Sequence, residues 1–258
     1  FFLYHEALKI NPNNAITHIK IANILLEFEK INNAVLEYKK AISLAPNDIK
    51  LHVIVGKMFS GIAYFDDAIE VYQKLIQTSK AKADNTVEIY YLLGCTFYEC
   101  GRWNDAIEAC KEVINIQPNS PDAHAKLGMA LFQIESYEHA ERELRKAITY
   151  QPKKSDFHCD LGKIFFRQNK CQDAIIEFEK AIDINIKNNT LDSIVYTHYA
   201  FALYANNKKK EAKTAIERAI GLFKNQGMND EAEQMEHLFE TIKTESSWKS
   251  FFKSFLSI

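Results

Sequence analysis

Histidine and carboxylate side chains gather in residues 121–152. His124 and His139 lie in this segment. The acidic residues that accompany them are Glu135, Glu138, Glu141 and Glu143. Imidazole and carboxylate groups at helical spacing are groups with which proteins bind zinc or transfer protons. Whether they form such a site here depends on the elements that position them.

The segment 121–152 is one copy of a pattern that recurs along the chain. A large side chain followed by a small one is found six times, at intervals of 34, 38, 34, 34 and 38 residues. The six pairs are Ile21-Ala22, Val55-Gly56, Leu93-Gly94, Leu127-Gly128, Leu161-Gly162 and Tyr199-Ala200. Twelve residues after each small residue comes an alanine, at Ala34, Ala68, Ala106, Ala140, Ala174 and Ala212. A fixed period of this length is typical of helical repeat proteins.

The pattern resembles the tetratricopeptide repeat (TPR), which places Leu-Gly, alanine, aromatic and proline positions across about 34 residues. The resemblance implies an all-α fold, a right-handed superhelical solenoid of antiparallel helix pairs. The six TPR units are residues 15–48, 49–82, 87–120, 121–154, 155–188 and 193–226. Small residues allow the two helices of a unit to approach closely, and stacked units then share one continuous core.

Two insertions and the N-terminal segment interrupt the regular frame. Residues 1–14 are expected to form the second helix of a truncated upstream repeat. Because the chain begins at Phe1 rather than at Met, we expect the natural protein to continue upstream. Four extra residues follow each of the units that end at 82 and 188. Since a helical turn has about 3.6 residues, we expect each insertion to lengthen the second helix before it.

The C-terminal residues 227–258 depart from the repeat pattern and are expected to form capping helices. Asn229 and Asp230 predict the start of a helix over residues 229–244, because such residues are typical of a helix N-terminus. The final residues, SSWKSFFKSFLSI, place their aromatic side chains on one helical face. This helix docks on the end of the array, or on a partner or a second copy of the chain, or on a membrane surface.

The repeat frame also explains the histidines. His124 stands at repeat position 4, counted from the first residue of its unit. The other units place His18, His52, Tyr90, His158 and Tyr196 at this position. A position shared by histidine and tyrosine favours the packing of a flat ring with a polar edge. Histidines in separate repeats are too far apart to share a metal ion, whose ligands lie about 2 Å from it. We therefore predict packing side chains and no metal site.

Composition and motifs argue against several further functions. The chain has 258 residues, 47% of them hydrophobic, and a net charge of −2, which indicates a globular protein without the basicity of nucleic-acid-binding domains. No apolar run reaches the about 18 residues of a membrane span, and no signal-peptide pattern begins the chain. The five cysteines follow no zinc or redox spacing, so we expect reduced thiols and a cytoplasmic protein. Phosphate-binding and catalytic motifs are absent, which predicts no catalytic residues and no cofactor.

The resemblance further implies that the first helix of each unit lines a concave groove for a partner. Its lining positions carry apolar and aromatic side chains with balanced charges, which suits an amphipathic helix or an extended peptide. The predicted partner-binding residues are Asn23, Lys57, Tyr91, Cys95, Tyr98, Lys126, Met129, Phe132, Lys163, Phe166 and Phe201. Alternatively, some of these aromatic side chains pack between neighbouring first helices. The carboxylate clamp of chaperone-binding relatives is not matched, since Ile54 stands where its second asparagine belongs.

We therefore expect a non-catalytic protein–protein interaction scaffold that binds a peptide or helix of a partner protein. Neither a nucleic-acid partner nor stable membrane insertion is expected. One alternative is the recruiting or regulatory portion of a larger enzyme, whose catalytic domain would lie outside these residues. A second alternative is a self-assembling structural repeat protein, which would associate through its open N-terminal end or its C-terminal helix.

Overall fold

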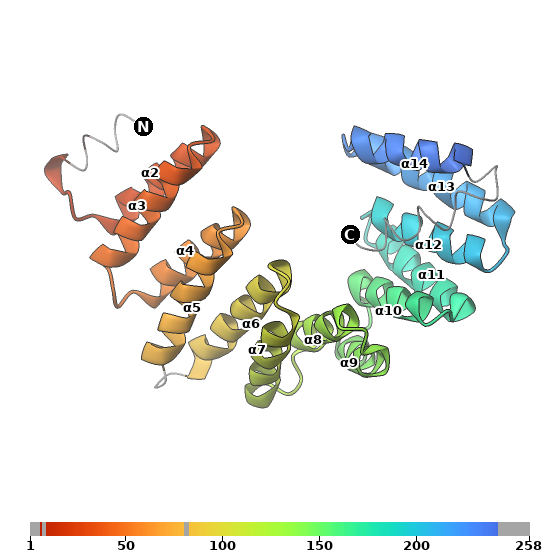
Figure 1. Ribbon diagram of the computed structural model, residues 1–258, viewed down its shortest axis with the longest axis horizontal. Helices are drawn as coiled ribbons and strands as arrows, with labels where there is room; N and C mark the ends of the chain where they lie inside the picture. The colour runs from red at the N-terminus through yellow and green to blue at the C-terminus, as the bar shows by residue number, and fades with distance from the viewer. Residues whose placement is uncertain (1–5, 7–8, 80–82, 242–258) are drawn as a thin grey trace. The chain divides into compact units, whose positions relative to one another are not determined.

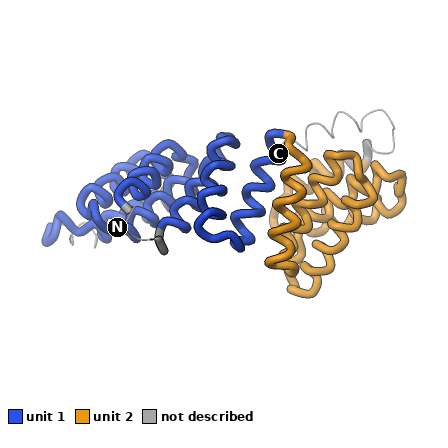
Figure 2. Tube along the Cα trace, turned by 90° about the horizontal axis from the view of Figure 1, so that it is seen from below, with its two compact units in different colours: residues 1–134 blue, residues 135–258 orange. Residues whose placement is uncertain are grey.

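The computed structural model describes residue 6 and residues 9–79 and 83–241. Half of the residues 1–14, which were expected to form an upstream helix, and the whole aromatic segment after residue 244 lie outside these described residues. The chain divides into two compact units, residues 1–134 and residues 135–258, which are coloured separately in Figure 2. Each unit is described by itself below.

Antiparallel α-helices joined by short turns make up both units (Figure 1). The helices of the first unit are α2 (Ala15–Glu27), α3 (Ile31–Leu44), α4 (Ile49–Gly61), α5 (Phe65–Ser79), α6 (Ala83–Glu99), α7 (Trp103–Ile116) and α8 (Pro121–Gln133). Those of the second unit are α9 (Tyr137–Tyr150), α10 (Ser155–Arg167), α11 (Cys171–Lys187), α12 (Ser193–Ala205), α13 (Lys209–Asn225) and α14 (Asn229–Thr241). The described residues contain no strand, and the predicted all-α solenoid of helix pairs is confirmed.

A left-handed residue at repeat position 15 ends the first helix of every repeat. The six residues with this positive φ are Glu29, Ala63, Gly101, Glu135, Asn169 and Asn207. In the second repeat, the Tyr64 N–H donates to the Phe59 carbonyl at 2.8 Å and the Ala63 N–H donates to the Ser60 carbonyl at 3.0 Å. This paired bonding satisfies the last carbonyls of the helix and reverses the chain. The second helix can therefore begin within three residues and run back along the first.

Small residues at repeat position 8 let a side chain of the second helix pack directly against the backbone of the first helix. A Cβ atom on Gly162 would lie only 2.6 Å from Cε1 of Phe178, and one on Gly56 would lie 2.6 Å from Cε1 of Tyr72. Both rings are buried at 1% exposure. The space that glycine leaves is therefore filled by an aromatic ring of the second helix, which gives the close packing typical of protein interiors.

The two insertions are accommodated differently. Helix α11 is lengthened to 17 residues and ends near Asn189, a left-handed residue with φ 55°, so the expectation is confirmed there. The expectation for the earlier insertion is wrong. Helix α5 ends at Ser79, whereas α6 begins at Ala83, four residues before the expected start of the third repeat. Helix α6 has 17 residues, against 13 for α8, so the extra residues lengthen the first helix of the third repeat.

Helix α14 begins at Asn229, the residue at which the sequence predicts the start of a C-terminal helix. It packs on α13, and its Ala232 and Met235 are buried. Between these two residues in the chain lie Glu233 and Gln234, which are polar and exposed. A helix with one apolar and one polar side covers the exposed core of the last repeat.

The packing at repeat position 8 generates a stability prediction. Gly162→Ala should destabilise the protein by about 1–3 kcal/mol, because the buried Phe178 ring must move away from the new methyl group. The matched control is Gly221→Ala on α13, where an added Cβ meets nothing within 4 Å. That change should be neutral or stabilise the helix by up to about 1 kcal/mol. Urea unfolding followed by circular dichroism measures both, and equal effects of the two substitutions would contradict the packing described here.

Candidate functional site

The predicted lining residues of the first unit lie on the exposed side of the first helices of its repeats, a surface that we call the first-helix face. Asn23 on α2 is exposed, and its side-chain oxygen accepts a hydrogen bond of 2.5 Å from the Tyr38 hydroxyl. Lys57 on α4 is exposed and forms a 2.8 Å ion pair with Glu88 of α6. Both side chains are thus oriented by a contact with a neighbouring helix, and both remain open to solvent.

Tyr98 of α6 is the centre of a cluster of four side chains on the first-helix face. Its ring meets that of Trp103 edge to face, with the ring centroids 5.2 Å apart. The Lys126 ammonium of α8 lies 4.7 Å from the centroid of the Tyr98 ring. Gln133 donates to the Tyr98 hydroxyl at 3.1 Å. These contacts, which we call the Tyr98 cluster, bring together two of the predicted residues, Tyr98 and Lys126.

Tyr91 lines a cavity of about 490 Å³ between α6, α7 and α8. The cavity wall combines apolar side chains, such as Val113 and Ile116, with the carboxylates of Glu88 and Asp122. Burial raises the pKa of the Tyr91 hydroxyl well above its usual range, so this group stays neutral and able to donate a hydrogen bond. Tyr91 therefore lines a hollow that the first helices α6 and α8 share with the second helix α7.

The remaining predicted residues differ in how far they reach solvent. Cys95, Met129, Phe132, Lys163 and Phe166 are all half-buried. On α10, Lys163 forms a 3.0 Å ion pair with Asp160, one turn away on the same helix. The prediction for Phe201 is wrong, because its side chain is only 1% exposed and cannot line an open surface. Helix α12, which carries Phe201, packs against α10, α11 and α13, so a lining position in the TPR pattern becomes a core position here.

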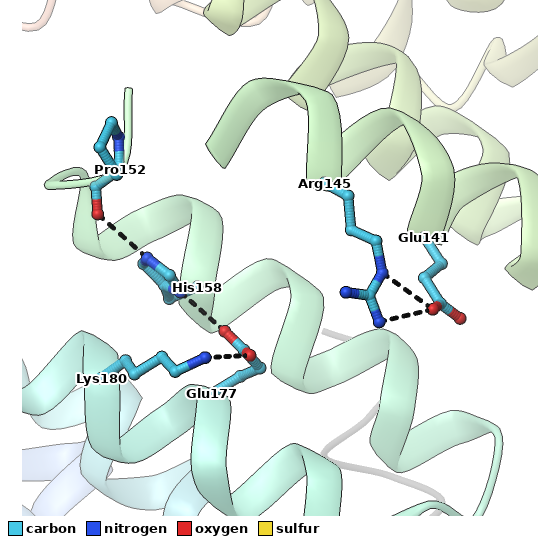
Figure 3. A network of polar contacts seen from close by, with 6 residues as sticks. All are labelled: Glu141, Arg145, Pro152, His158, Glu177 and Lys180. Carbon is cyan, nitrogen blue, oxygen red and sulfur yellow. Dashed lines mark hydrogen bonds and ion pairs between the residues drawn. The ribbon is translucent and has the colours of Figure 1, made fainter. Parts of the chain in front are cut away.

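The histidines at repeat position 4 have partners that the sequence prediction missed. His158 is 7% exposed, and Figure 3 shows it between two oxygen acceptors. Its Nε2 lies 3.1 Å from the Pro152 carbonyl of the preceding turn, and its Nδ1 lies 2.7 Å from a carboxylate oxygen of Glu177 on α11. Lys180 donates to the other oxygen of Glu177 at 2.7 Å. The ring thus joins a turn, a first helix and a second helix.

The first repeat has the same arrangement. His18 is fully buried, with Nε2 at 3.1 Å from the Pro12 carbonyl and Nδ1 at 2.5 Å from a carboxylate oxygen of Glu37. We call this arrangement of proline carbonyl, histidine and glutamate the histidine latch. Each latch glutamate follows its histidine by 19 residues. The sequence contains this spacing a third time, at His124 and Glu143, so the repeated interval was a signal that could have identified the partners.

The latch fixes the protonation of its ring. A carbonyl and a carboxylate only accept hydrogen bonds, so a histidine that contacts both must carry a proton on each nitrogen. Burial alone would raise the pKa of Glu177, but the hydrogen bonds from His158 and Lys180 outweigh burial and lower it. Glu177 is therefore ionised at neutral pH, and the latch is a buried pair of imidazolium and carboxylate. Its geometry holds protons in place, which is a structural role.

Groups that could perform other chemistry are few in the described part of the chain. There, no set of three or more His, Cys, Asp or Glu side chains is arranged to hold a metal ion. All five cysteines are free, and burial raises the pKa of the Cys110 and Cys159 thiols to about 12. Thiols with such a high pKa are poor nucleophiles. The described helices also include none that is both long and apolar enough to cross a bilayer.

The latch generates a prediction about acid stability. Because the folded-state pKa of Glu177 is lowered from 4.5, its contribution is complete above this value and is lost as the pH falls through the lower folded pKa. Glu177→Gln should therefore cost about 1–3 kcal/mol at neutral pH and should flatten the loss of stability below about pH 4.5. Urea unfolding between pH 7 and pH 3 measures this. Glu108→Gln, in an exposed ion pair with Lys111, is the control and should change stability by less than about 1 kcal/mol.

Three sequence profiles of one family match the chain. A profile described as TPR repeat matches residues 94–134, and two described as tetratricopeptide repeat match residues 125–189 and 15–48. Among curated proteins, the human DnaJ homolog subfamily C member 7 is 29% identical over 84 residues. That alignment covers 31% of this chain and 17% of the relative, so the chain matches only a small part of that protein.

Solved structures of TPR proteins have the same fold. MamA is 25% identical, with a TM-score of 0.56, and the match covers 69% of this chain and 93% of MamA. A tetratricopeptide repeat protein from Parabacteroides merdae is 16% identical, with a TM-score of 0.67, and the match covers 90% of this chain and 89% of that protein. The second likeness shows the fold alone. Together with the helix pairs and the repeat positions described above, the three profile matches show that this chain belongs to the tetratricopeptide repeat family.

Proposed function

We propose that this chain is a non-catalytic interaction scaffold that binds a peptide or helix of a partner protein on its first-helix face. The observation that carries the proposal is the row of incompletely buried apolar side chains on α4, α6 and α8. Ile54 is 47% exposed, and Tyr91, Tyr98 and Met129 are half-buried. Aromatic and methionine side chains that are partly open to solvent, on rigid helices, are typical anchors of protein interfaces.

Charge on the first-helix face supports a peptide ligand more than a polyanion. Lys57 is paired with Glu88, and the cavity beside Tyr91 carries the carboxylates of Glu88 and Asp122. A surface on which cations are matched by anions does not attract a nucleic-acid backbone. Alternating charges around apolar side chains fit an amphipathic helix or an extended segment, whose backbone and side chains can meet both kinds of group.

The test removes the proposed anchor side chains by substitution and leaves the helices intact. Tyr91→Ala together with Met129→Ala should weaken partner binding at least tenfold, because buried anchors contribute about 2 kcal/mol or more each. Affinity purification with mass spectrometry identifies partners of the wild type, and calorimetry with the purified partner then gives the affinities. Circular dichroism must show unchanged helicity in the variant.

A matched control places the same kind of change on second helices. Tyr150 on α9 is 49% exposed and Ile176 on α11 is 40% exposed. Tyr150→Ala with Ile176→Ala should leave the affinity for the same partner within about twofold of the wild type, since surface changes away from an interface have little effect. If this control lost binding and the first-helix variant retained it, the proposed binding face would be wrong.

A further inference from the structure

Repeat positions 4 and 23 vary together along the chain, with one exception. Histidine at position 4 is accompanied by glutamate at position 23 in three repeats, as in His18 with Glu37. The two repeats without histidine have tyrosine at position 4 and alanine at position 23, as in Tyr90 with Ala109. The second repeat breaks this rule, because His52 is accompanied by Val71. A latch histidine is therefore present there without its carboxylate.

His52 is buried with half of its hydrogen-bonding capacity unused. The side chain is 4% exposed. Its Nδ1 lies 2.9 Å from the Asp48 carbonyl, and this is its sole hydrogen bond to any described residue. Since a carbonyl only accepts, Nδ1 carries a proton, and Nε2 is the atom that still lacks a partner. Nε2 is not fully enclosed by protein atoms, so a ligand that enters beside it can accept its hydrogen bond.

His52 lines a cavity of about 410 Å³ between α3, α4 and α5. The apolar part of its wall comes from Ile42, Phe59 and Val71. Because the second helices α3 and α5 form two of its sides, this cavity is separate from the first-helix face of the proposed function. It has room for a ligand with a short apolar body, which must place a polar group at Nε2.

The charged groups of the cavity belong to α3 and α5. Lys39 lies 2.6 Å from Asp67, which leaves this pair neutral. Glu70 and Lys74, both exposed, contribute one further charge of each sign. These four charges cancel, so the wall itself supplies no excess carboxylate for His52. An added anion would thus meet no net repulsion, and it would have an imidazole to bind.

The equivalent place in the fifth repeat shows what the second repeat lacks. There the groove between α9, α10 and α11 has a volume of about 210 Å³ and is lined by Glu177, Phe165 and Arg145. Phe165 occupies the same repeat position as Phe59, and Glu177 the same position as Val71. The carboxylate that pairs with His158 is thus built into the wall of the smaller groove. In the larger cavity the corresponding wall atom is a valine methyl group.

We propose that the cavity lined by His52 and Val71 binds the carboxylate of a ligand. The ring takes up a second proton and donates from Nε2 to the carboxylate, while Ile42, Phe59 and Val71 contact the aliphatic body of the ligand. A glutamate side chain of a peptide and a free short-chain carboxylic acid share this chemistry.

The first experiment uses the full chain and follows the His52 ring by NMR. The probes are butyrate, its uncharged analogue butyramide, and the capped tripeptide Leu-Glu-Leu with its Leu-Gln-Leu control. The His52 signal is assigned by its loss in His52→Gln. We expect saturable shifts of this signal with butyrate or the Glu peptide and no shifts with the amide analogues. A response to the peptide alone identifies a peptide ligand, and a response to butyrate as well identifies a site for free acids. No response to either carboxylate overturns the proposal.

A second experiment supplies the carboxylate from the chain itself. Val71→Glu should place a carboxylate beside the His52 ring and occupy the cavity. The variant should therefore melt within about 3 °C of the wild type and lose its response to butyrate and to the Glu peptide. In the His52→Gln background, where no imidazolium faces the new carboxylate, Val71→Glu should lower the melting temperature by more than about 6 °C. If Val71→Glu destabilises both backgrounds equally, the position cannot hold a carboxylate and the proposal is wrong. Loss of the first-helix interaction would leave both experiments unaffected.

Discussion

The close approach of the two helices within each repeat is the constraint on which the rest of the structure depends. Gly56 and Gly162 admit the rings of Tyr72 and Phe178 to the space that a Cβ atom would fill. The second helix consequently covers one side of the first helix almost completely. Side chains that this packing leaves partly open to solvent include Tyr91 and Tyr98. The exposure of these side chains on the first-helix face is in this sense a product of the core packing.

The histidine latch adds a polar constraint to an apolar core. Burying a charged imidazole is costly unless both N–H groups have acceptors, and the latch supplies a carbonyl on one side and a carboxylate on the other. At His158 the carbonyl comes from the turn that precedes α10 and the carboxylate comes from α11. Only one mutual arrangement of these three segments satisfies the ring. A buried pair of this kind therefore orients the turn and the helices, whatever its net contribution to stability.

The sequence predicted those features that depend on one helix and its period. Helix pairs, their order and the packing role of repeat position 8 follow from a repeated local pattern, and α14 begins at the residue that its N-terminal signal indicates. Features that depend on contacts between helices were missed. From the sequence of α11 alone, Glu177 would be assigned to a surface ion pair with Lys180 on the same helix. Its hydrogen bond with His158 was missed because it joins two different helices. The burial of Phe201 likewise depends on the neighbours of α12, which the pattern of one repeat does not specify.

The joint variation of repeat positions 4 and 23 has a physical reason in volume and charge. A tyrosine ring is larger than an imidazole, and in the third repeat the residue at position 23 is Ala109, a small residue that needs no polar partner. An imidazole leaves more room and has two nitrogens to satisfy, so the glutamates of the first and fifth repeats fill the room and bind the ring. Valine in the second repeat does neither, because it is shorter than glutamate and has no acceptor. The larger cavity beside His52 is thus a consequence of the difference between Val71 and its equivalents. The Nδ1 atom, which binds glutamate in the latch, donates to the Asp48 carbonyl in the second repeat.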